Sequence, residues 1–428
     1  MLICAPAVPT LLEKLGSNDP SHDSSLIVTI WNLGAIIGFF FIGPLSETYG
    51  RRPVYNGCNI LFCVFQVGAA LSTTVGMLIA FQFLNGLTVA SAALNTSIVG
   101  DMFDIEQRGK AQSLVAVMPL CGPVLGPLIG GYMTAGLGWR AVFYFVAILV
   151  GIQELPFAIF FRETYEPLVL TKRAAQGQIE AENPKVSSRS NEADSNTLSK
   201  PGYSWASFLR PLKVFLIPTF LIPASCVAII YGFVYILFTT ISEVFQARYA
   251  FSTGASGLSF IGIGIGMATA TYVCGATPDW HTSRMKRRHG GEVKPEWRLP
   301  LMVPGSCAAS AGLLLYGWTA EAYVHWIVPI LGTSFVGFSL SATAIPAITY
   351  LADTFGRYRA SAIAAMHMYR LILTILLPLA GSALYNRLGM GWGNSVLAFI
   401  SIVMIPVPIL FLKFGERLRQ KFVIESRL

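Results

Sequence analysis

The sequence predicts an all-α membrane protein, a bundle with about eleven complete transmembrane helices. Two observations lead to this fold class. Of the 428 residues, 54% are apolar and only 12% are charged, whereas soluble domains carry about 25% charged residues. The charges are also clustered, and charge-free runs such as residues 55–100 are long enough to cross a bilayer. The composition therefore argues against a soluble enzyme, a disordered protein and a nucleic-acid binder.

The charge-free runs give the spans in chain order. Residues 1–12 are apolar, but at about 1.5 Å per residue they cross only half a bilayer. We therefore expect a first helix that is truncated, either naturally or through an incomplete gene model. Complete spans are expected at residues 26–46, 55–73, 75–99, 111–135, 141–161, 214–240, 253–276, 301–320, 326–350, 360–385 and 394–414.

A long polar stretch divides the chain. It contains the low-complexity run at residues 187–192, which cannot bury a core and is expected to be disordered. A short repeat supports two related halves, since Asp101 and Asp353 each begin an Asp-x-Phe triplet that is followed by Arg, Ala and Ser. We expect an N-terminal helical half, a cytoplasmic linker, a C-terminal helical half and a cytoplasmic tail, at residues 1–161, 162–213, 214–414 and 415–428.

The basic residues predict the orientation. If the loop that holds Arg51 and Arg52 is cytoplasmic, the cytoplasmic loops together contain 25 of the 30 Lys and Arg residues, as the positive-inside rule requires. This asymmetry explains the net charge of +8 without nucleic acid.

Cysteine spacing and catalytic motifs give no sign of a cofactor or an enzyme. None of the seven cysteines forms a CxxC pair or lies at metal-ligand spacing from a histidine, so we interpret them as small apolar residues in helices. HExxH, GxSxG and phosphate-loop motifs are absent from the sequence. We expect no metal, no cofactor and no enzymatic activity.

The strongest motif lies between the first two complete spans and holds Gly43, Glu47, Gly50, Arg51 and Arg52. It resembles the loop between helices two and three of the major facilitator superfamily, in the form typical of fungal drug:proton antiporters with twelve spans. Gly43 would allow close helix approach. The resemblance implies a gating network in which the acid and the two arginines pair across the halves when the transporter is open outward. The alternative is an ordinary basic turn that fixes the topology.

A second motif lies in the fourth complete span, the fifth helix of a full bundle. Gly122, Gly126 and Gly130 recur every four residues on one helix face, next to Pro127 and Gly131. Such spacing is typical of close helix packing, and prolines favour a bend. The run resembles the antiporter motif of exporters in this superfamily. The alternative is a packing face that any multi-pass protein could have.

The resemblance extends along nearly the whole chain and implies a function. It implies two six-helix halves and a secondary active transporter that exports a small organic molecule by proton antiport and alternating access. The substrate would be a drug, a toxin, a fungal secondary metabolite or a polyamine. Protons and the lipid bilayer would be its other partners, and we expect a monomer in the plasma membrane, with the vacuolar membrane as the alternative.

One position departs from the family pattern. Antiporters of this group usually have Arg-Phe-Leu-x-Gly in the fourth helix, but here the arginine position holds Gln82. Glutamine carries no charge, so proton coupling through this position is in doubt. Together with the half first helix, Gln82 motivates a second hypothesis, a non-transporting or degenerate member of the family.

Ionisable residues inside predicted spans are functional candidates because charge is costly in a bilayer. Glu154 is such a residue, either for proton exchange or as an inner-leaflet acid that reaches water. His367 and Arg370 lie one turn apart in a later span. They either face the cavity, where they would favour anions or substrate carbonyls, or form a structural cation site bonded to helix carbonyls.

Uncharged candidates complete the predicted cavity. Asn32, Gln82 and Asn85 are polar residues inside spans. An aromatic series with i, i+4, i+7 spacing would share one helix face, which would line the cavity or pack against lipid and other helices; it consists of Tyr231, Tyr235 and Phe238. A cavity of this kind suits a lipophilic or weakly polar organic molecule.

Overall fold

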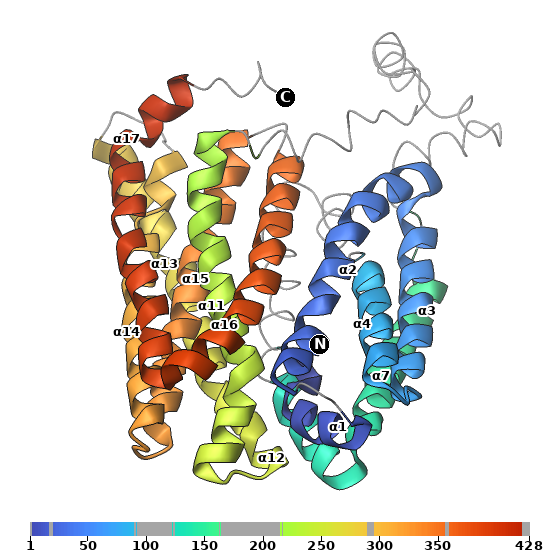
Figure 1. Cartoon of the computed structure of the whole chain (residues 1–428). Helices are drawn as coiled ribbons and strands as arrows, with labels where there is room; N and C mark the ends of the chain where they lie inside the picture. The colour runs from blue at the N-terminus through green and yellow to red at the C-terminus, as the bar shows by residue number, and fades with distance from the viewer. Residues whose placement is uncertain are drawn as a thin grey trace, which may run out of the picture.

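The computed structural model describes residues 2–16, 20–89, 91, 122, 125–161, 163, 215, 217–288, 295–355 and 359–421. All regular secondary structure in these residues is helical. The prediction of an all-α membrane bundle is confirmed. The helices form two groups, one from the N-terminal part of the chain (blue to teal) and one from the C-terminal part (green to red) (Figure 1). The exact domain boundaries stay a prediction, because the linker at 162–213 lies almost entirely outside the described residues.

The N-terminal group matches the predicted spans where it is described. It consists of η1 (Leu2–Ala7), α1 (Val8–Leu15), α2 (Pro20–Tyr49), α3 (Arg51–Ala70), α4 (Val75–Val89), the helical residues 125–137 and α7 (Trp139–Phe160). The short first segment ends at Gly16, whose left-handed conformation (φ 68°) caps α1.

The C-terminal group contains α11 (Pro218–Tyr249), α12 (Thr253–Ser256), η3 (Gly257–Phe260), α13 (Ile261–Arg288), η4 (Pro295–Arg298), α14 (Met302–Glu321), α15 (Ile327–Phe355), α16 (Arg359–Met404) and α17 (Pro406–Lys421). Two predicted spans, 360–385 and 394–414, meet within α16. The chain turns there at Gly389, whose positive φ of 74° suits glycine. The Glu321 carboxylate accepts a hydrogen bond from the Gly391 backbone N–H just beyond this turn.

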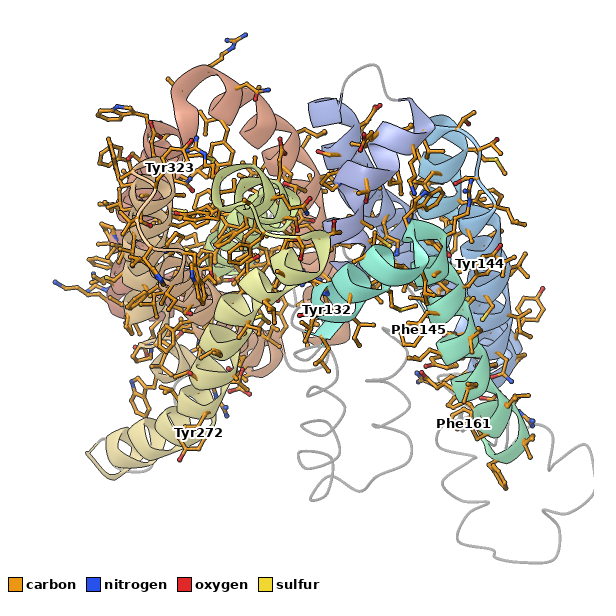
Figure 2. The ribbon with its side chains drawn as sticks, turned by 90° about the horizontal axis from the view of Figure 1, so that it is seen from below. Tyr132, Tyr144, Phe145, Phe161, Tyr272 and Tyr323 are labelled. Atoms are coloured by element: carbon orange, nitrogen blue, oxygen red, sulfur yellow. The ribbon has the colours of Figure 1, made fainter. Side chains whose placement is uncertain are left out.

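Apolar side chains divide between the interior and the outer surface of the bundle. Among the described residues, six helices are long and apolar enough to cross a membrane, and three shorter helices are also apolar. Tyr316 and Phe233 are buried in the C-terminal group, and Leu11 and Phe143 are buried in the N-terminal group. Tyr272 is 80% exposed and projects outward from α13 (Figure 2), as expected for a side chain that faces lipid.

Candidate functional site

A polar cluster lies where α2 crosses α4. The crossing is close because glycines meet there: a Cβ on Gly34 would overlap the Phe83 carbonyl oxygen, and one on Gly86 would overlap the Trp31 carbonyl oxygen. Asn32 stands beside this crossing on α2. The crossing therefore fixes polar side chains of the N-terminal group inside the bundle.

The amides at this crossing are buried and unsatisfied. Asn32, Gln82 and Asn85 are at most 1% exposed, and neither amide atom of any of them has a hydrogen bond of regular geometry within the described part of the chain. Buried amides without partners are costly. The three predicted cavity residues of the N-terminal group are thus buried polar groups without a partner among the described residues.

The C-terminal group places aromatic and cationic side chains near Asn32. The Arg370 guanidinium of α16 lies over the Tyr231 ring of α11, with 4.3 Å between the guanidinium carbon and the ring centroid. The Tyr235 hydroxyl is close to the Asn32 amide and within Coulombic range of Arg370. His367 is likewise within Coulombic range of Arg370, and its Nδ1 is buried without a partner among the described residues. The structure therefore brings candidates from α2, α11 and α16 together between the two groups.

Phe238 contacts this cluster through Tyr235, whose ring lies edge-on to it with 5.6 Å between the ring centroids. Phe238 is 3% exposed and stacks on Phe260, with 6.0 Å between the ring centroids. The aromatic series of α11 therefore connects two surroundings: the tyrosines lie near Arg370, and Phe238 packs into the core of the C-terminal group, against which both tyrosines also pack.

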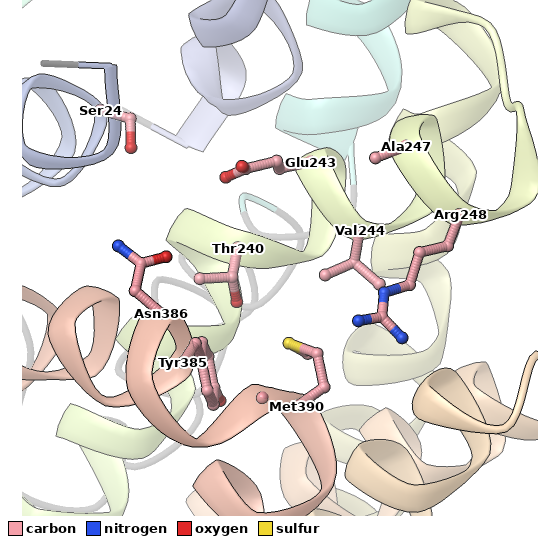
Figure 3. Close-up of a pocket in the computed structure, with 10 residues that line it drawn as sticks. Ser24, Thr240, Glu243, Val244, Ala247, Arg248, Tyr385, Asn386 and Met390 are labelled. Atoms are coloured by element: carbon pink, nitrogen blue, oxygen red, sulfur yellow. The ribbon is translucent and has the colours of Figure 1, made fainter.

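A pocket of about 220 Å³ lies between α2, α11 and α16 (Figure 3). This is the end of the bundle opposite the start of α3 (Figure 1), and we call it the outer end. Side chains from α2, α11 and α16 line the pocket, so both groups contribute. The sequence analysis did not predict this pocket. Its lining residues include Ser24, Thr240, Glu243, Arg248, Tyr385 and Asn386.

The glycine motif of the predicted antiporter helix packs against two partners. A Cβ on Gly130 would overlap the Ile3 carbonyl oxygen of η1, and one on Gly126 would lie 3.4 Å from the Ile3 nitrogen. A Cβ on Gly131 would lie 2.7 Å from the Thr253 carbonyl oxygen of α12. The motif helix therefore contacts η1 on one side and the C-terminal group on another.

Two further motif positions differ in their surroundings. A Cβ on Gly257 of η3 would overlap the Pro127 carbonyl oxygen, so Pro127 also contacts the C-terminal group. Around the Cβ position of Gly122, no atom of the residues that the structure describes lies within 4 Å. The close contact thus involves residues 126–131 rather than the whole predicted face.

The predicted gating loop begins α3. Gly50, with φ 98°, precedes the helix, and the Glu163 carboxylate accepts from the backbone N–H groups of Arg51 (2.9 Å) and Arg52 (3.2 Å). An acid at this position bonds orphan amides and complements the helix dipole. The cap was not predicted, because Glu163 is more than 100 residues away in sequence.

The arginine side chain of this loop that is described in detail bonds within the N-terminal group. The Arg52 guanidinium donates to the Ala158 carbonyl oxygen of α7 at 2.6 Å. Gly43 and Glu47 lie in α2, but their side-chain positions are outside the described structure. The gating network between the halves stays a prediction.

Glu154 lies between α3 and α7, apart from the group formed by Asn32, Tyr231, Tyr235 and Arg370, which we call the central cluster. The residue is 8% exposed, and its carboxylate accepts a hydrogen bond from the Asn59 side-chain amide at 2.6 Å. The Asn56 amide nitrogen, turned toward the carboxylate, donates to the other oxygen at 3.1 Å. Both asparagines escaped the sequence analysis, although their spacing of three residues places them on one face of α3. This geometry indicates a polar clamp between two helices.

Comparisons with known proteins identify the family. A model described as the Major Facilitator Superfamily matches residues 2–373. The MFS-type transporter tndD of Aspergillus flavipes is 40% identical over 98% of this chain and 78% of its own length. The efflux pump radE of Floropilus chiversii is 35% identical over 97% of this chain and 77% of its own length.

A solved structure shares the fold. A D-xylose-proton symporter is 17% identical and superposes with a TM-score of 0.69 over 96% of this chain and 92% of its own. The predicted family resemblance is confirmed, as are the multi-pass membrane fold and the expectation that the protein is not an enzyme. The chain belongs to the major facilitator superfamily of membrane transporters.

Proposed function

We propose that this transporter is a secondary active exporter of a small organic molecule and that it works by alternating access. The two helix groups would rock about the central cluster, as in other transporters built from repeated halves. One relative is named an efflux pump, and the sequence resembles exporters at both motifs. The central cluster supports an organic substrate, because it combines aromatic faces with a few polar groups.

The observation that carries this proposal is the position of the glycine motif. Gly131 and Pro127 contact the C-terminal group at α12 and η3, while Gly130 contacts η1. The helix that carries the glycine motif (residues 125–137) therefore lies at the interface between the two groups. Small residues there let the backbones approach closely when the groups meet and separate again without interlocking side chains.

We propose that export is driven by the proton gradient through proton antiport. Gln82 replaces the arginine that the family pattern has in the fourth helix, so proton transfer would use a different group. The remaining proposals concern context: the protein would work as a monomer in the plasma membrane, with the vacuolar membrane as the alternative location.

The test is efflux of labelled amphiphiles from yeast cells that lack their own exporters, with and without a protonophore. We expect efflux that the protonophore abolishes. Gly131→Val should reduce efflux, since its side chain would collide with the Thr253 carbonyl. Gly136→Val, on the same helix with open space around its Cβ position, is the matched control and should transport normally.

Two other outcomes would contradict parts of this proposal. Efflux that persists with the protonophore would exclude proton antiport but keep the exporter. A protein confirmed at the cell surface that exports none of the compounds would favour the non-transporting alternative.

A further inference from the structure

Arg370 differs from five other arginines whose side-chain contacts the structure describes. Each of those arginines donates to a backbone carbonyl or pairs with a carboxylate; they are Arg52, Arg140, Arg248, Arg298 and Arg419. The described contact of the Arg370 guanidinium is instead the aromatic face of Tyr231. Its Nε is buried and has no acceptor among the described residues.

The position of Arg370 makes this lack of a partner costly. It lies eleven residues into α16, about 17 Å along the helix at about 1.5 Å per residue, which is near the middle of a bilayer about 30 Å thick. The described ion pairs, Arg298–Asp353 and Arg419–Glu296, are both elsewhere. A charge in a low-dielectric interior needs an opposite charge to stabilise it.

The neighbouring side chains fit an anion that has an apolar body. Tyr231 holds the guanidinium against its ring, which leaves the edge of the guanidinium free to donate. The Tyr235 hydroxyl and the Asn32 amide provide hydrogen bonds nearby. His367 adds a further polar group one turn away rather than a negative charge. Arginine binds carboxylates through paired N–H donors, and the tyrosine rings provide apolar contact.

We propose that the substrate is an amphipathic organic carboxylate and that Arg370 binds its carboxylate group. This inference rests on the proposed function, because it assigns a substrate class to the same exporter. Asn32 would bond the carboxylate from α2 of the opposite helix group, and Tyr235 from α11 of the same group as Arg370, so the ligand would connect α2 of one half with α11 and α16 of the other. The substrate charge would thereby stabilise Arg370 only while the ligand is bound.

The test measures binding to the purified full-length protein in lipid nanodiscs. The probes are matched sets on naphthyl, anthracenyl and pyrenyl scaffolds, each as the carboxylate, the methyl ester and the primary amine. We expect carboxylates to bind about tenfold more tightly than their esters, which is the size of one charge-assisted hydrogen bond. Arg370→Lys should keep part of this preference, and Arg370→Met should abolish it.

The melting temperature of Arg370→Met distinguishes a ligand-binding role of Arg370 from a structural role. If Arg370 serves ligand binding and not the structure, Arg370→Met should raise the melting temperature of the ligand-free protein, because a half-buried charge without a counter-ion among the described residues is removed. Arg387→Gln, an exposed arginine of the same helix, should change neither binding nor melting. A lower melting temperature for Arg370→Met, or equal binding of carboxylates and amines, would overturn the proposal.

Efflux of the same probes separates this inference from the proposed function. Export of esters or amines that is unchanged in Arg370→Met would keep the exporter and refute the carboxylate site. Carboxylates that bind with the expected preference but are never exported would keep the site and refute the exporter.

Discussion

Gln82 shows how a single buried side chain can be tested for function against stability. It is 1% exposed, and both amide atoms lack partners within the described structure. Gln82→Leu replaces it with an apolar side chain of similar size. We expect a gain of about 1–3 kcal/mol in the free energy of unfolding, because an unsatisfied buried amide is removed, together with weaker efflux. Thermal unfolding and the efflux assay measure the two effects.

The control for this prediction is a glutamine that does have a partner. Gln246 donates to the Ser256 hydroxyl at 3.0 Å, so Gln246→Leu should lower the melting temperature. A loss of stability in Gln82→Leu would mean that its amide is satisfied, and unchanged efflux would remove Gln82 from the cavity.

Glu154 is the opposite case, a buried acid whose bonds are satisfied. Glu154→Leu would leave the Asn56 and Asn59 amides without their acceptor. We expect a loss of about 1–3 kcal/mol in the free energy of unfolding, with a smaller loss in Glu154→Gln, which keeps one oxygen. Substitution of Gln153, an exposed residue of the same helix, is the matched control for these Glu154 variants. Efflux by folded Glu154→Gln that became insensitive to a protonophore would show a coupling role instead.

The sequence could identify Glu154 but not its function. An acid in a long apolar run is conspicuous in any hydropathy pattern. Its partners are two asparagines on another helix, and only the register between α3 and α7 brings them together. The same reason explains why the Glu163 cap of α3 was missed, while Arg370 was recognised as a candidate from its own helix alone.

At the scale of elements, the glycine motif predicts that one methyl group added at Gly130 has a large effect on the melting temperature. A Cβ on Gly130 would overlap the backbone carbonyl of Ile3, which cannot move aside as a side chain could. Gly130→Ala should therefore displace η1 and lower the melting temperature by several degrees, consistent with a cost of about 1–3 kcal/mol for overpacking. Gly136→Ala has open space and should melt normally or slightly higher. Equal melting of the two variants would contradict the close packing described for η1.

The start of α3 gives a second prediction at this scale. Glu163→Ala removes the acceptor of the Arg51 and Arg52 backbone N–H groups. We expect a loss of about 1 kcal/mol, as for other helix N-caps, while Glu163→Gln should lose less. Thermal unfolding at low and high salt separates the charge effect from the hydrogen bonds, because salt screens only the former.

Helix positions were largely predictable, but their breaks were not. Charge-free runs located the spans because the bilayer core excludes charge over a fixed length. The run expected at 253–276 matches the span Thr253–Gly275, but it begins with α12 and η3 before α13 continues it, and backbone hydrogen bonding changes there without any change in polarity. The turn at Gly389 was likewise expected only as an interval between spans, since one left-handed glycine is enough to produce it.

At the scale of the whole molecule, the resemblance of the motifs to a known family predicted the architecture. The contacts between the two halves could be identified only in the structure. Residues from distant parts of the chain meet at the outer end. A Cβ on Gly254 of α12 would lie 3.1 Å from the Tyr132 ring of the motif helix, and Figure 2 shows Tyr132 where this helix approaches the C-terminal group. Alternating access requires that such contacts separate once in every cycle.

Joining this contact covalently should therefore stop transport. We expect Tyr132→Cys combined with Gly254→Cys to form a disulfide under mild oxidation, because their side chains would be adjacent. Efflux should fall on oxidation and recover with a reductant. The two single variants are the controls for the seven native cysteines and should be insensitive to oxidant. A crosslinked protein that still exports its substrate would show that the outer end stays closed throughout the cycle, and would refute the rocking of the two groups.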